Sequence, residues 1–231
     1  MSGQEPKAHQ TIEVQFSRAM EDYLKAIYQS ASEDERVSTT RLAEKISCSA
    51  ASVTNMLQKL SELKLVLYEP YQGVILTPAG KKVALEIVRH HRLIELYLAE
   101  VLGYSWDKVH AEAEKLEHVI SEEFEEKIDQ ALGYPTTDPH GDPIPTREGQ
   151  VEQERFHSLW EISDVENVKV RRVSDSDSEA LRYLAELGIY PEVEISVLKK
   201  APFNGPIHIE VDNNEHSLSE QLARQIFVVP A

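Results

Sequence analysis

The sequence has a single cysteine, Cys48, which excludes an internal disulfide framework and a multi-cysteine zinc site. It also lacks any apolar run close to the roughly 20 residues of a membrane-spanning helix, so we expect no membrane partner. The first residues contain no apolar signal core, which predicts a cytoplasmic protein. With 231 residues, 41% apolar and 28% charged, the chain is typical of a soluble protein with two or three small domains.

Positive charge is scarce, because 24 Lys and Arg stand against 40 Asp and Glu and the formal net charge is −16. Such a charge argues against nucleic acid as a partner. The acidic excess is nevertheless confined to residues 91–231, since residues 1–90 hold 11 basic and 11 acidic side chains. Between Arg36 and His90 the local net charge is +4, and eight of the nine histidines lie at His90 or beyond. One part of the chain can therefore approach DNA while the other binds a cation.

The N-terminal third shows the order of a winged helix-turn-helix. Apolar spacing predicts a helix over residues 16–30, a short helix carrying Leu42 and Ile46, and a second helix over residues 50–63. Two short β-type runs follow around a turn at residues 70–73, and Pro78 then begins a long helix that reaches about residue 102. A three-helix bundle with a surface hairpin is the alternative interpretation.

In a winged helix-turn-helix the second helix of the motif enters the major groove, and its N-terminal residues contact base edges. Here that end carries small or polar side chains that fit a groove and can form hydrogen bonds. The predicted DNA-binding residues are Ser49, Ala51, Ser52, Thr54 and Asn55.

The remainder predicts a helical part and a β-rich part. Another amphipathic helix is expected over residues 103–132, with its N-cap near Ser105. Four prolines between residues 135 and 145 exclude regular structure there and indicate an ordered loop or linker. From residue 165 onward β-type runs dominate, with one helix at residues 178–187, which predicts a small barrel.

A polar stripe of imidazoles and carboxylates marks the predicted helix over residues 103–132. At 100° per residue, four side chains fall within an arc of about 100°: they are His110, Glu114, Glu117 and His118. The preceding helix places His91 and Glu95 one turn apart. Such residues converging from two neighbouring helices form metal sites in helical bundles, although a solvated face with ordinary charged pairs would show the same spacing.

These residues and the order of elements resemble the diphtheria-toxin-repressor family of metal-dependent regulators, from about Met20 to the C-terminus. The motifs that carry the resemblance are Arg89-His-His-Arg-Leu-Ile-Glu, Lys108-Val-His, Glu117-His-Val-Ile-Ser and Pro139-His-Gly-Asp-Pro-Ile-Pro. The resemblance implies a mainly α fold with a small β domain. Its parts would be a winged helix-turn-helix domain over residues 1–77, a helical metal-binding and dimerisation domain over residues 78–150, and a linker with an SH3-like (FeoA-like) domain over residues 151–231.

The resemblance also implies two metal sites. The primary site would take its ligands from the first helix and the metal-binding domain: Asp22, Glu114, Glu117 and His118. An ancillary site would take His91, Glu95 and His110. The C-terminal domain could add Asp177, with Glu179 as a nearby substitute, whereas Ala180 cannot coordinate an ion.

The predicted ion is Mn(II), with Fe(II) as the second choice. The segment around Asp22 resembles the manganese-responsive branch, whereas iron-responsive members have a methionine and a cysteine at the positions of Asp22 and Glu114. Hard oxygen ligands suit Mn(II). Lys25 departs from the short manganese regulator, which has a glutamate ligand there, and this argues against a two-ion cluster of that type.

The expected function is a repressor of metal-homeostasis genes, not an enzyme, that binds a palindromic operator of double-stranded DNA as a homodimer when loaded with its ion. A metal-dependent hydrolase and a metal-storage or chaperone protein are the rivals from other classes. The sequence contains no His-Glu-x-x-His motif, no Gly-x-Ser-x-Gly elbow and no phosphate-binding glycine-rich loop.

Overall fold

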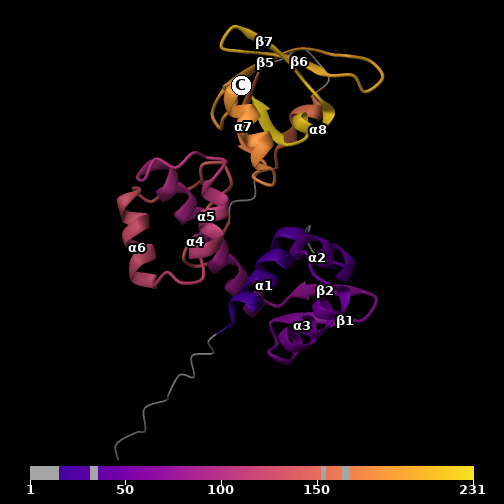
Figure 1. Cartoon of the computed structure of the whole chain (residues 1–231), viewed down its shortest axis with the longest axis vertical. Coiled ribbons are helices and arrows are strands. Elements are labelled where there is room, and N and C mark those ends of the chain that lie inside the picture. The colour runs from indigo at the N-terminus through magenta and orange to yellow at the C-terminus, as the bar shows by residue number, and fades with distance from the viewer. Residues whose placement is uncertain (1–15, 32–35, 152–154, 163–166) are drawn as a thin grey trace, which may run out of the picture. The chain divides into compact units, whose positions relative to one another are not determined.

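The computed structural model describes residues 16–31, 36–151, 155–162 and 167–231. The chain divides into two compact units, Met1–Val83 and Ala84–Ala231. Figure 1 shows the fold of the chain and labels most of its helices and strands. Among the described residues, no helix combines the length and the apolar character needed to cross a bilayer.

The first unit is a winged helix-turn-helix, as predicted. Its elements are α1 (Arg18–Ser30), α2 (Thr39–Ile46), α3 (Ala50–Glu62), β1 (Val66–Glu69) and β2 (Gly73–Leu76), with the two strands antiparallel. Each helix begins at a serine whose hydroxyl accepts a hydrogen bond from the backbone N–H three residues later, and these are Ser17, Ser38 and Ser49. Apolar side chains that are almost fully buried form the core: Leu24, Ile27, Leu42, Val53, Leu57, Leu60, Val66 and Val74.

The second unit contains most of the long helix α4 (Pro78–Glu100), followed by α5 (Val109–Leu116) and α6 (Glu122–Ala131). The single helix expected over residues 103–132 is therefore wrong, because the chain forms two helices there. Ser121 explains the break, since its hydroxyl accepts from the Phe124 N–H and begins α6 anew. Glu117 and His118 consequently lie just past the end of α5.

The loop over residues 133–150 is ordered, and two arginines of α4 hold it. Arg89 donates to the carbonyl oxygen of Pro145 at 2.8 Å, and Arg92 donates to that of Pro143 at 2.5 Å. Proline carbonyls are open acceptors in a segment without regular structure. The four prolines therefore form a shaped loop on α4 rather than a linker.

The C-terminal part is a six-stranded antiparallel sheet in the order β3-β8-β4-β5-β6-β7. Its elements are β3 (His157–Ser158), η1 (Leu159–Glu161), β4 (Asn167–Val173), α7 (Ser178–Glu186), β5 (Glu194–Lys200), β6 (Ile207–Val211), β7 (Asn214–Leu218), α8 (Glu220–Ala223) and β8 (Ile226–Pro230). The short strand β3 and the polar strand β7 were not expected, because neither carries an apolar run. The predicted mainly α chain with a small β domain is confirmed.

Candidate metal centre

Two turns of α4 place imidazole and carboxylate together inside the second unit. His91 and Glu95 are one turn apart on the same face, and both are buried. The Nε2 atom of His91 lies 2.9 Å from Oε1 of Glu95. A fully buried carboxylate is costly unless a cation or hydrogen-bond donors compensate it, so this face of α4 is built for a polar partner.

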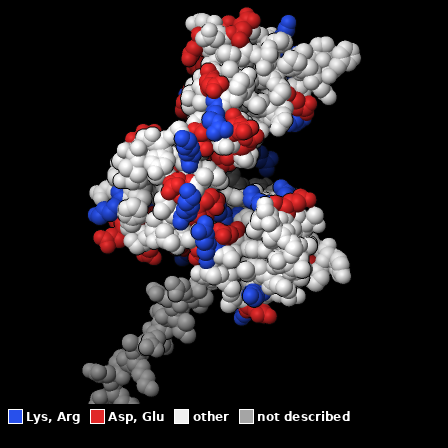
Figure 2. Space-filling view, in the orientation of Figure 1, with Lys and Arg blue, Asp and Glu red and all other residues white. Residues whose placement is uncertain are grey.

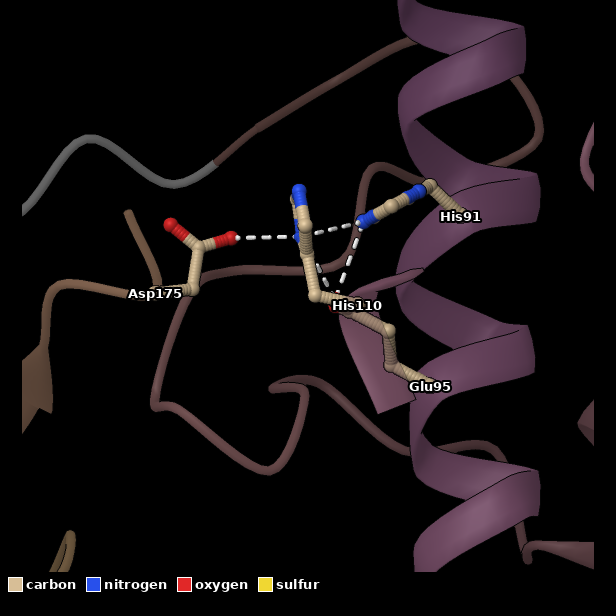
Figure 3. A group of neighbouring side chains, drawn as sticks. All are labelled: His91, Glu95, His110 and Asp175. Atoms are coloured by element: carbon tan, nitrogen blue, oxygen red, sulfur yellow. Dashed lines mark hydrogen bonds and ion pairs between the residues drawn. The ribbon is translucent and has the colours of Figure 1, made fainter. Parts of the chain in front are cut away.

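The polar side chains that face His91 and Glu95 are His110, from α5, and Asp175, from the β domain (Figure 3). His110 Nδ1 lies 3.1 Å from Glu95 Oε1 and 3.1 Å from His91 Nε2. The same nitrogen lies 3.1 Å from a carboxylate oxygen of Asp175, in the segment between β4 and α7. Donor atoms of all four residues lie within 4.8 Å of one another, a spacing that a single metal ion can bridge.

The charges in this group are strongly coupled. The hydrogen bonds with Asp175 and Glu95 raise the pKa of His110 to about 10, against the opposing effect of burial. Burial raises the pKa of Glu95, but the two histidines outweigh it and hold that pKa far below its ordinary value. Burial likewise raises the pKa of Asp175, and the hydrogen bond from His110 brings it down to about 2. Both carboxylates are therefore ionised at neutral pH and available to a cation.

A second carboxylate meets the other side of the His91 ring. Glu117, which is fully buried at the end of α5, places Oε2 2.5 Å from His91 Nδ1. Its other oxygen, Oε1, lies 3.1 Å from Nε2 of His118. Donor atoms of His91, Glu114 and Glu117 also lie within 4.8 Å of one another. His91 thus contacts Glu95, a predicted ligand of the ancillary site, and Glu117, a predicted ligand of the primary site.

Two predicted ligands, Asp22 and Asp177, lie outside the two groups of donor atoms just described. Asp22 lies on α1 and belongs to the first compact unit, so its assignment as a ligand stays a prediction. Asp177 is the N-cap of α7, where its carboxylate accepts hydrogen bonds from the N–H groups of Glu179 and Ala180. Asp175, not Asp177, is the aspartate of the β domain that joins the histidines, which corrects the expected position. An aspartate directly before an amphipathic helix is a typical N-cap, and this signal in the sequence indicates that Asp177 is already engaged.

The predicted DNA-binding residues lie at the N-terminal end of α3. Four of them are exposed there, namely Ser49, Ala51, Ser52 and Asn55. The fifth, Thr54, is half-buried and donates its hydroxyl hydrogen to the carbonyl of Ala50 at 3.0 Å. Ser49 is engaged as the helix cap, and its hydroxyl also lies 2.9 Å from that of Ser52. The exposed end of α3 is polar and open, as a base-reading surface requires.

Three family models cover the chain in succession. The iron dependent repressor N-terminal DNA binding domain matches residues 15–74, and the metal binding and dimerisation domain of the same repressors matches residues 77–146. A FeoA domain matches residues 157–230, which confirms the predicted SH3-like part.

Known proteins agree with these matches. The chain is 28% identical over 220 residues to the iron-dependent repressor IdeR of Mycobacterium leprae, a match that covers 90% of this chain and 95% of that protein. It is 37% identical over 103 residues to the transcriptional regulator MntR of Bacillus pumilus, covering 45% and 71%. A solved manganese-dependent transcriptional repressor in complex with manganese is 41% identical, with a TM-score of 0.85 over 92% of this chain and all of that one.

Proposed function

The chain belongs to the diphtheria-toxin-repressor family of metal-dependent transcriptional repressors, and we propose that Mn(II) is the ion that activates it, with Fe(II) as the alternative. The observation that carries this proposal is the group of His91, Glu95, His110 and Asp175. Imidazole nitrogen and carboxylate oxygen suit Mn(II), and none of these four side chains offers sulfur. The solved relative in complex with manganese and the manganese regulators of similar fold support the same choice.

The donor set fits a divalent ion on electrostatic grounds. Histidines coordinate metal in their neutral form. When His91 and His110 are neutral, the fully buried carboxylate of Glu95 loses the positive charge that they provide. A bound dication supplies that charge, and Asp175 contributes a second carboxylate to balance it. The four residues would then orient around the ion without an unpaired buried charge.

We propose a second ligand set from the end of α5, made of Glu114, Glu117 and His118. The support is that Glu117 is fully buried and that its two oxygens face His91 and His118. The resemblance to the family adds Asp22 of α1 to this set. Operator binding by an Asp22→Ala variant tests that assignment. If Asp22 is a ligand, the variant should need more free metal than the wild type to bind the operator.

DNA binding follows from the winged helix-turn-helix unit. We infer that the exposed N-terminal end of α3 reads base edges in the major groove. We also infer that the chain acts as a homodimer, so that its operator is palindromic, with half-sites separated by about one helical turn or a multiple of it. Figure 2 shows Lys and Arg side chains intermixed with acidic ones on the visible face, so the net charge of −16 leaves basic groups that can meet phosphate.

The genes so controlled would be those of metal homeostasis, because a repressor that responds to a free ion can adjust the supply of that ion. We infer that the chain binds metal in order to regulate and not in order to catalyse, since the metal-binding group is combined with a DNA-binding domain in a family of repressors. We place this activity in the cytoplasm, where an operator is accessible to it.

Operator binding under buffered free metal tests the proposal. Genomic fragments selected with Mn(II) would be titrated with the protein across a series of divalent ions, and we expect the strongest response to Mn(II) and then Fe(II). Glu95→Gln should abolish most of the response, whereas Glu123→Gln, which removes the same charge from an exposed site on α6, should keep it. Operator affinity that does not change on chelation would contradict the proposal.

A further inference from the structure

Glu95 also belongs to another group of buried donors, formed with two residues of the loop over residues 133–150. Its companions are Asp138 and His140, and the three side chains are 0%, 6% and 0% exposed. Donor atoms of Glu95, Asp138 and His140 lie within 4.8 Å of one another. The two ligand sets described above use neither loop residue.

The loop is shaped so that these side chains stay inside. Oδ1 of Asp138 accepts hydrogen bonds from the backbone N–H groups of His140 and Asp142, at 2.8 and 2.9 Å. The carbonyl of His140 in turn accepts from the N–H of Val173 on β4, at 2.8 Å. Both ends of the group are therefore fixed by backbone hydrogen bonds, and the donors are preorganised.

The two ring nitrogens of His140 differ in their hydrogen bonding. Its Nε2 lies 2.9 Å from the carbonyl oxygen of Trp106, which can only accept, so Nε2 carries the proton. Nδ1 is buried and has no hydrogen-bond partner among the described residues. A histidine that donates one N–H to a backbone carbonyl keeps its other ring nitrogen for an ion, which is the arrangement typical of a metal ligand.

One of the two carboxylates also has an unused acceptor. Oε1 of Glu95 faces His91 and His110, but its Oε2 is buried without a hydrogen-bond partner in the part of the chain that the structure describes. Oδ2 of Asp138 lies 3.7 Å from Nε of Arg92, which is too far for a hydrogen bond. Two buried acidic side chains thus lie close together, and Oε2 of Glu95 is left without a hydrogen-bond partner among the described residues.

We propose that Glu95, Asp138 and His140 bind a further divalent cation in a fully buried site, with Glu95 as a carboxylate bridge to the ion held by His91, His110 and Asp175. The proposal rests on the proposed function only through this shared carboxylate. Two carboxylate oxygens and one imidazole nitrogen suit a transition-metal ion such as Mn(II), Fe(II) or Zn(II). The dication balances the two negative charges and satisfies the lone pairs of Glu95 Oε2 and His140 Nδ1 together.

A proton on Asp138 is the competing account, and it explains less. A protonated Asp138 can donate one hydrogen bond, either to Glu95 Oε2 or to His140 Nδ1. The other acceptor would stay buried and unpaired, at a cost of about 1–3 kcal/mol. A cation leaves neither acceptor unpaired.

The ion would have a structural effect distinct from activation. Asp138 and His140 belong to the loop that lies on α4 and is hydrogen-bonded to β4, through Arg92 and Val173 respectively. An ion bound to Glu95 and to this loop therefore ties α4, through the loop, to β4 within the second unit.

Metal content measures the site directly. The full-length protein would be equilibrated with Mn(II), passed into metal-free buffer, and analysed by elemental mass spectrometry for ions per protomer. Asp138→Asn keeps an oxygen for the two backbone N–H groups and removes the charge, so we expect it to lose one ion per protomer. Glu148→Gln, an exposed residue of the same loop, should retain the wild-type content. An Asp138→Asn protein with the wild-type content would overturn the proposal.

Anomalous diffraction from wild-type crystals grown with Mn(II) gives a test that does not depend on a variant folding. Peaks in both groups support this site and the proposed function alike. A peak only among His91, His110 and Asp175 overturns the further site and leaves the proposed function standing. A peak only between Asp138 and His140 supports the site but overturns the proposed activating group, and no peak in either group overturns both.

Discussion

The Nδ1 atom of His91 lies 2.5 Å from Oε2 of Glu117, while Nε2 of the same ring lies 2.9 Å from Glu95. One imidazole therefore contacts carboxylates of both proposed ligand sets. The sequence assigns His91 to the ancillary set alone, and its loss would then weaken activation only in part. The contact with Glu117 gives His91 a larger role. His91 can bind the ion beside Glu95, and it also orients Glu117, which is a proposed ligand of the ion at the end of α5.

His91→Gln should therefore reduce the apparent affinity for Mn(II) by about 10–100-fold, the size of effect seen when a partner of a metal ligand is removed. Fluorescence or calorimetric titration with buffered Mn(II) measures this loss. His157→Gln serves as the control, because that ring is 76% exposed on β3. Equal metal affinities for the two variants would show that His91 is only a core residue.

The two neighbouring aspartates of the β domain should behave differently. Asp175→Asn removes a carboxylate from the side of His110, so we expect Mn(II) affinity to fall by about 10–100-fold. Asp177→Asn should leave it unchanged, since asparagine caps a helix about as well as aspartate. Metal titrations of the two variants in parallel make the comparison, and the reverse order of effects would restore Asp177 as the ligand.

The buried ion pair between α4 and α6 should govern acid stability. Burial raises the pKa of Glu125, but the hydrogen bonds from His90 and Arg89 outweigh it and lower the pKa to about 2, against 4.5 in an unfolded chain. The Glu125 carboxylate takes up a proton less readily in the folded state than in the unfolded chain. Ionised Glu125 therefore stabilises the fold above about pH 4.5, and this effect is lost as the pH falls toward 2.

Glu125→Gln should lower the free energy of unfolding at pH 7 by about 3 kcal/mol, because it leaves a buried guanidinium with fewer partners. The remaining pair of Arg89 with Asp129, at 2.6 Å, limits the loss. Urea unfolding at pH 7 and at pH 3 measures both effects in the metal-free protein. The difference between wild type and variant should shrink at the lower pH, and a constant difference would contradict the assignment.

Gly141 should not tolerate a side chain. Its φ is +88°, and a Cβ there would lie 1.9 Å from the carbonyl oxygen of Arg171 on β4. We expect Gly141→Ala to destabilise the protein by roughly 2 kcal/mol or more, since backbone strain alone costs about 1–3 kcal/mol. Gly133→Ala is the matched control, because it has φ +75° with no atom within 4 Å of an added Cβ and should cost only about 1 kcal/mol. Thermal unfolding of the two variants distinguishes a clash from strain.

Local patterns in the sequence were enough to predict most helices and the winged helix-turn-helix. Serine caps and apolar spacing act over three or four residues, so Ser17, Ser38 and Ser49 mark the beginnings of α1, α2 and α3 without tertiary information. The continuous amphipathic spacing over residues 103–132 predicts one helix, whereas the Ser121 cap divides this segment into α5 and α6. The polar strand β7 had no apolar run to reveal it, and its pairing with β6 decides its conformation.

The sequence by itself determined which residue types were available for chemistry: carboxylates and imidazoles gathered beyond His90, a near-neutral DNA-binding part, and no cysteine cluster. Tertiary structure decided which of them meet. Asp175 is 65 positions from His110, and Asp138 is 43 positions from Glu95, so neither pairing has a periodicity that a linear pattern could show. These long-range contacts depend on how the proline-containing loop joins α4 to β4, and that packing is a property of the whole core rather than of any segment.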